Sequence, residues 1–116
     1  MKVAYASRTG NVEAVVEKLG ITDAVKIEDG TETIEGEYIV MCYTDGKGIV
    51  PEAVEAFLKA NPGVKGVVAS GNSERHADTF CWAADIISKE YGVPTIAKLD
   101  KQGTDEDLDA IRAALD

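Results

Sequence analysis

The stretch that decides the fold is Ser7-Arg8-Thr9-Gly10-Asn11-Val12, which follows the apolar run Val3-Ala4-Tyr5-Ala6 and precedes a helical pattern. A strand that turns through small hydroxyl residues and a glycine into a helix points several backbone N–H groups and the helix dipole at one position. Ser7 and Thr9 can add hydroxyl donors, and Gly10 lets the backbone approach an oxyanion closely. The stretch therefore indicates a phosphate-binding turn. An ordinary connector with Asn11 or Thr9 as helix cap is the alternative.

Apolar strands and helical stripes alternate along the rest of the chain. Residues 38–42 are apolar throughout, which is typical of a strand covered on both faces. The short run 24–27 predicts an edge strand, and residues 29–37 form a polar connection. Pro51 is expected at a first helical position, and Thr104 with Asp107 forms a capping box. The pattern predicts strands over 2–6, 24–27, 38–42, 64–69 and 95–99, and helices over about 12–19, 51–61, 80–91 and 104–115.

This alternation predicts one α/β domain over residues 1–116: a flavodoxin-like three-layer sandwich around a five-stranded parallel sheet in the order 2-1-3-4-5. In this order the ligand site lies between strands one and three. Two further loops follow strands three and four, Tyr43-Thr44-Asp45-Gly46-Lys47-Gly48 and Ser70-Gly71-Asn72-Ser73-Glu74-Arg75-His76. All three loops leave the same sheet edge. They suit a planar ligand with a terminal phosphate, for which FMN is the best candidate, with Tyr43 or His76 against its ring.

The composition narrows the possible partners and compartments. Twelve Lys and Arg against 21 Asp and Glu give a net charge of −9, which argues against nucleic-acid binding. No apolar run approaches the roughly 18 residues of a membrane span, and no cleavable signal is visible, so we expect a cytoplasmic protein without membrane contact. Cys42 and Cys81 form neither a C-x-x-C pair nor a zinc pattern and are expected in the core. Trp82 lies off the helical stripe, either half-buried at the helix edge or as an anchor for a partner.

Other activities of similar folds lack their residues. Strand three ends in Cys42-Tyr43 rather than the Asp of a receiver domain, and the first loop has no nucleophilic Cys for a phosphatase. Neither G-x-x-x-x-G-K-[ST] nor G-x-G-x-x-G is present. No metal site is expected.

The loops resemble those of the NrdI family, small flavodoxin-like proteins that serve class Ib ribonucleotide reductase. Residues 7–12 are similar to its S-x-T-G-N-V loop, and residues 43–51 to its Y-T-x-G-x-G-x-V-P segment. Residues 69–72 match its A-S-G-N, and residues 101–105 are similar to its G-T-x-x-D stretch, which opens the last helix. The resemblance runs from end to end. The resemblance departs after Asn72. The family's R-N-W-G-D-x-F-G is replaced there by a stretch one residue longer, Ser73-Glu74-Arg75-His76-Ala77-Asp78-Thr79-Phe80-Cys81. This is the segment expected to stack on the flavin ring.

The resemblance implies an FMN-dependent redox activator rather than a conventional enzyme. Reduced FMN would react with dioxygen, and the superoxide-type oxidant would pass to the dimanganese centre of the reductase small subunit, assembling its tyrosyl radical. A flavin or ferredoxin-type reductant is implied. The flavin carries the chemistry, so no residue is expected to be catalytic. The alternative is a stand-alone flavodoxin that acts as a soluble electron shuttle.

The expected cofactor residues have individual roles. Ser7, Thr9, Gly10 and Asn11 are assigned to the phosphate; Arg8 either adds charge there or is solvated. Gly46 and Gly48 would lie at the N5 edge of the flavin or form a plain turn. Lys47 could raise the two-electron potential and His76 could stack or relay protons, although either could be solvated. The full set is Ser7, Arg8, Thr9, Gly10, Asn11, Val12, Tyr43, Thr44, Asp45, Gly46, Lys47, Gly48, Ser70, Gly71, Asn72, His76, Asp78 and Phe80.

Overall fold

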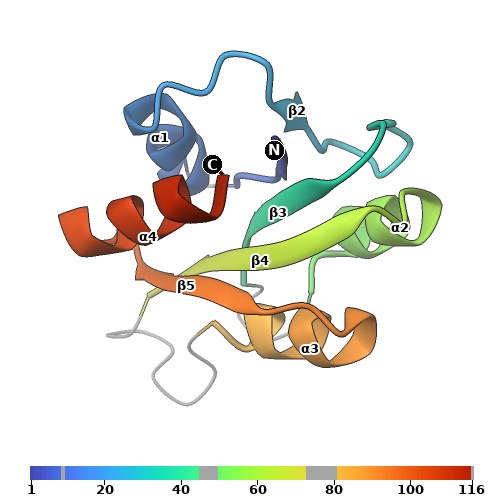
Figure 1. Cartoon of the computed structure of the whole chain (residues 1–116). Helices are drawn as coiled ribbons and strands as arrows, with labels where there is room; N and C mark the ends of the chain where they lie inside the picture. The colour runs from blue at the N-terminus through green and yellow to red at the C-terminus, as the bar shows by residue number, and fades with distance from the viewer. Residues whose placement is uncertain (9, 45–49, 73–80, 116) are drawn as a thin grey trace.

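The computed structural model describes residues 1–8, 10–44, 50–72 and 81–115, and its strands form one parallel sheet in the order β2-β1-β3-β4-β5 (Figure 1). The predicted α/β class and strand order are confirmed. The strands are β1 (Lys2–Tyr5), β2 (Val25–Lys26), β3 (Tyr38–Tyr43), β4 (Val64–Gly71) and β5 (Thr95–Asp100). The helices are α1 (Asn11–Lys18), α2 (Glu52–Ala60), α3 (Trp82–Tyr91) and α4 (Asp105–Leu115).

The central strand β3 divides the core into two clusters. Tyr38, Val40 and Cys42 pack in the cluster beneath α2 and α3, whereas Ile39 and Met41 pack beneath α1 and α4. Successive side chains of a strand point to opposite faces, so a continuous apolar run fills both clusters. Figure 1 shows the two helix pairs on opposite faces of the sheet, which confirms the predicted three-layer sandwich.

The connection from β2 to β3 packs against α2 without forming a helix. β2 itself is shorter than the predicted 24–27. Gly30 has a φ of 88°, and a Cβ at this position would lie 2.7 Å from the carbonyl oxygen of Ala53 and 2.7 Å from Cβ of Ala56. Only a glycine allows the connection to approach α2 this closely.

A buried asparagine holds the same connection in place. Asn61 is 5% exposed; its Oδ1 accepts a hydrogen bond from the N–H of Ile34 at 3.0 Å, and its Nδ2 donates to the carbonyl oxygen of Glu32 at 3.1 Å. The Tyr38 hydroxyl donates to the carbonyl oxygen of Asn61 at 2.6 Å. These contacts satisfy polar groups that burial would otherwise leave unpaired.

Three element boundaries test the predictions. β4 continues past residue 69 to Gly71, because Ser70 and Gly71 pair with β5. Pro51 is the N-cap of α2 rather than its first residue, since its ψ of 139° is not helical. The predicted capping box of α4 is confirmed: the Thr104 N–H donates to Asp107 Oδ2 at 2.9 Å, and the Asp107 N–H donates to Thr104 Oγ1 at 3.3 Å.

The side chains at the start of α3 are divided between core and solvent. Cys81 is fully buried just before the helix, whereas Trp82 is 48% exposed, in agreement with a half-buried position at the helix edge. None of the helices within the described ranges is long and apolar enough to cross a bilayer.

Both cysteines are fully buried, as predicted. Burial raises the pKa of the Cys42 thiol from 9.0 to about 12, with a smaller contribution from Cys81, and burial likewise raises the pKa of Cys81 to about 12. At pH values between 9 and 12, the thiol has lost its proton in the unfolded chain but keeps it in the folded protein. Stability from this source is therefore complete below pH 9 and is lost as the pH rises from 9 towards 12.

We predict that the free energy of unfolding falls more steeply above pH 9 in the native sequence than in Cys42→Ala. The expected difference in slope is about 1.4 kcal/mol per pH unit, the value for one proton. Urea unfolding at several pH values from 9 upward measures both slopes, and lysine and tyrosine titration is shared by the two proteins. Parallel slopes would show that Cys42 ionises equally in both states.

Candidate cofactor site at the carboxyl edge of the sheet

The ends of β1, β3 and β4 are joined by backbone hydrogen bonds at one edge of the sheet. The Ala6 N–H donates to the Met41 carbonyl at 2.9 Å, and the Thr44 N–H donates to the Ser70 carbonyl at 2.9 Å. The Lys101 N–H adds the end of β5 by donating to the Gly71 carbonyl at 2.7 Å. The segments that follow these strands therefore start from one rigid platform, at the switch point where open α/β sheets bind ligands.

The turn after β1 directs a helix N-terminus and a hydroxyl to the same place. Gly10 is the N-cap of α1 in the left-handed conformation, with φ 93°, and a Cβ there would meet none of the described residues within 4 Å. Ser7 Oγ accepts a hydrogen bond from the Glu13 N–H at 3.3 Å, so the hydroxyl lies beside the first turn of the helix. A helix N-terminus with a hydroxyl beside it suits an anion.

The individual residues of this turn contribute differently. Val12 is only 2% exposed and packs in the cluster beneath α1 and α4, so its side chain is a core residue. Asn11 is the first residue of α1 rather than its N-cap, because Gly10 occupies that position without a side-chain cap. Arg8 is exposed, and its Cζ lies 5.0 Å from the centre of the Tyr43 ring. This cation–π contact was not predicted.

The end of β3 contributes a ring and an orphaned hydroxyl. The partly buried Tyr43 packs against both core clusters. Thr44 Oγ1 is buried and has no hydrogen-bond partner among the described residues. A buried hydroxyl without a partner is costly, so the site offers an incoming polar ligand a group ready to bond.

The end of β4 is fixed by neighbours on both sides. Ser70 is 4% exposed and its hydroxyl donates to the Lys101 carbonyl at 2.5 Å. Cys81 Sγ lies 3.4 Å from the Ala69 carbonyl and 3.7 Å from the Leu99 carbonyl, and the residue has φ 53°. Cys81 thus returns the chain beneath the end of β4, a role for which its sequence context gave no signal. Gly71 and Asn72 remain partly exposed at this edge.

A hollow of about 410 Å³ opens beside the first turn. Its walls come from the ends of β1, β2 and β3 and from the start of α2, and include Arg8, Lys26, Ile27, Tyr43 and Pro51. The contributions of Ile27 and Pro51 follow only from tertiary packing. Several expected site residues, Thr9, Asp45, Gly46, Lys47, Gly48, His76, Asp78 and Phe80, lie outside the described residues.

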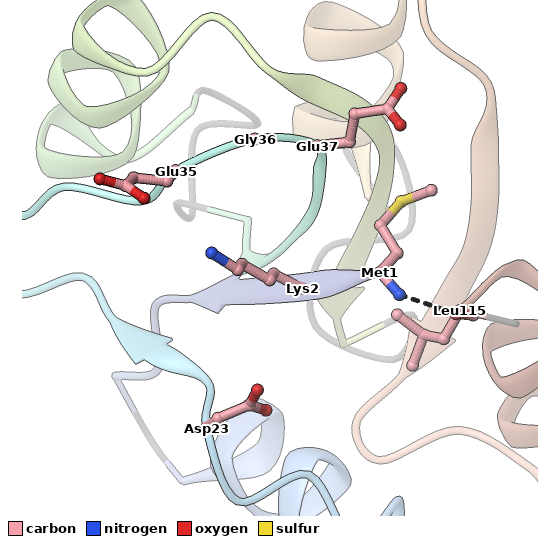
Figure 2. Close-up of a pocket in the computed structure, with 7 residues that line it drawn as sticks. All are labelled: Met1, Lys2, Asp23, Glu35, Gly36, Glu37 and Leu115. Atoms are coloured by element: carbon pink, nitrogen blue, oxygen red, sulfur yellow. Dashed lines mark hydrogen bonds between the residues drawn. The ribbon is translucent and has the colours of Figure 1, made fainter.

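A larger hollow of about 780 Å³ lies at the opposite edge, around the chain ends. Figure 2 shows Met1, Lys2 and Leu115 near Glu35, Gly36 and Glu37, with the Met1 amine donating to the Leu115 carbonyl at 3.0 Å. This edge holds the amino ends of the strands, and ligands of open α/β sheets bind at the carboxyl ends. The smaller hollow therefore lies at the expected edge, beside the β1 and β3 ends of the candidate site.

Known proteins share this architecture and sequence. The family described as NrdI Flavodoxin like matches residues 3–113. Protein NrdI of Bacillus licheniformis is 34% identical over 110 residues, covering 94% of this chain and 82% of that protein. Protein NrdI of Deinococcus radiodurans is 37% identical over 116 residues, covering 97% of this chain and 80% of that protein. The structure of a Streptococcus pneumonia TIGR4 flavodoxin is 25% identical, with a TM-score of 0.69 over 97% of this chain and 92% of that one. The chain belongs to the NrdI family of flavodoxin-like proteins.

Proposed function

We propose that this FMN protein, which its family ties to ribonucleotide reductase, generates a superoxide-type oxidant from dioxygen. It delivers the oxidant to the dimanganese centre of a class Ib small subunit, where the tyrosyl radical is assembled. Electrons would come from a flavin or ferredoxin-type reductant. The proposal is carried by the platform that joins the ends of β1, β3 and β4 in a chain of this family.

The residues at the platform fit FMN. The left-handed Gly10 is the N-cap of α1, and a phosphate at this N-terminus would be stabilised by backbone N–H groups and the helix dipole. Thr44 supplies a buried hydroxyl that lacks a partner among the described residues. The donors at this site are neutral hydroxyls and amides. Such donors suit a phosphate ester, which several hydrogen bonds can hold, better than they suit a metal ion.

Bound FMN supplies the electron transfer and the reaction with dioxygen. The chain's own residues bind and orient it: we assign Ser7, Thr9, Gly10 and Asn11 to the phosphate. Tyr43 and Thr44 are assigned to one side of the ring, and Ser70, Gly71 and Asn72 to the other. Because the Ser70 hydroxyl donates to the Lys101 carbonyl and the Ser70 carbonyl accepts from the Thr44 N–H, Ser70 would support this side of the site, and the partly exposed Gly71 and Asn72 would face the ligand.

Further ring contacts stay predictions from the sequence. Asp45, Gly46, Lys47, Gly48, His76, Asp78 and Phe80 are assigned to the loops around the ring. Among these, Lys47 would raise the two-electron potential through its positive charge.

We predict that Ser7→Ala weakens FMN binding about 10- to 150-fold, because a hydrogen bond to a charged group contributes roughly 1.5–3 kcal/mol. Riboflavin, which lacks the phosphate, should bind Ser7→Ala and the native protein equally. Quenching of flavin fluorescence measures all four dissociation constants. Ser88→Ala is the matched control, because that hydroxyl donates to the Val93 carbonyl at the end of α3. Equal losses for FMN and riboflavin would remove Ser7 from the phosphate site.

We predict that the fully reduced protein produces superoxide when air is readmitted after anaerobic reduction with dithionite. Superoxide is measured as cytochrome c reduction that superoxide dismutase abolishes, with free FMN and the apoprotein as controls. Adding a manganese-loaded class Ib small subunit should yield a tyrosyl-radical signal by electron paramagnetic resonance. Slow oxidation without superoxide, together with widely separated one-electron potentials, would instead support the electron shuttle.

A further inference from the structure

Arg8 connects the turn after β1 to the end of β3. Its Cζ lies 5.0 Å from the centre of the Tyr43 ring, within the range of a cation–π contact. Within the described residues Arg8 forms no ion pair. The guanidinium therefore has one clear partner in this part of the chain, the face of an aromatic ring.

Tyr43 is partly buried and is anchored by the core. It is the last residue of β3, pairs with Ser70 of β4, and packs against both hydrophobic clusters. Arg8 also lines the 410 Å³ hollow together with Tyr43. The side chain of Arg8 thus contacts the Tyr43 ring at the wall of the candidate site.

We propose that Arg8 is a positioning residue, which fixes the Tyr43 ring for flavin binding and acts through that ring rather than on the phosphate. The proposal rests on FMN binding at this edge, as proposed above. A planar guanidinium that stacks on an aromatic face limits the rotation of both side chains. A ring already held in the bound orientation loses less conformational freedom when the flavin arrives.

Two consequences separate this role from a phosphate contact. Since the ring system is common to FMN and riboflavin, loss of Arg8 should weaken both ligands by the same factor. Since the effect passes through Tyr43, it should disappear when that ring is absent. The expected factor is about two to five, the equivalent of an exposed cation–π contact.

The test is a double-mutant cycle of Arg8→Gln and Tyr43→Leu, read by flavin fluorescence with FMN and with riboflavin. We expect Arg8→Gln to weaken both ligands about two- to fivefold. Arg8→Lys should recover only part of that loss, because it keeps the charge without the planar guanidinium, and Arg8→Gln should have no further effect in Tyr43→Leu. The visible absorption of bound FMN should change in Arg8→Gln but not in Ser7→Ala, because only the former alters the environment of the ring.

Other outcomes overturn the proposal in distinguishable ways. A loss confined to FMN would make Arg8 a phosphate ligand, and an unchanged affinity and spectrum would make it a solvated side chain. An equal loss in the Tyr43→Leu background would mean that the two residues act independently. Failure of the native protein to bind either flavin would instead reject the proposed function itself.

Discussion

The parallel pairing of β3 with β1 and β4 is the constraint on which the site depends. Val40 of β3 is paired with Ala4 and with Val67, and the pairing continues past the strands through the amides of Ala6 and Thr44. Because parallel strands share a direction, this register brings three chain-reversing segments to one edge. Any ligand that uses all three segments is positioned by the sheet rather than by the loops themselves.

The main features of the fold were predictable because each rests on a local pattern. The apolar run 38–42 predicts a doubly covered strand, and the Thr104–Asp107 box predicts the start of α4. The boundaries that were wrong depend on partners distant in sequence. β4 reaches Gly71 only because Leu99 and Asp100 pair with its end, and nothing near residue 70 encodes that pairing.

The candidate site was predictable to the level of segments but not of individual contacts. Gly10 was predicted to allow close approach of an oxyanion, whereas the feature that the structure shows is its left-handed φ of 93°, which favours glycine. The side chain of Val12 faces the core, as the helical stripe itself indicated. The contact of Arg8 with Tyr43 joins residues 35 positions apart (43 minus 8), and a cation–π pair has no sequence signature. The same holds for Cys81, whose thiol meets carbonyl groups of two strands.

The central claim is that FMN binds at the carboxyl edge of the sheet. The most direct test is the ¹H–¹⁵N spectrum of the labelled apoprotein during titration with FMN. The account predicts shifts concentrated in the amides of residues 7–13, 43–44 and 70–72, with Lys2 and residues 35–37 unchanged. Shifts concentrated instead around Lys2 and residues 35–37, at the hollow of Figure 2, would contradict it.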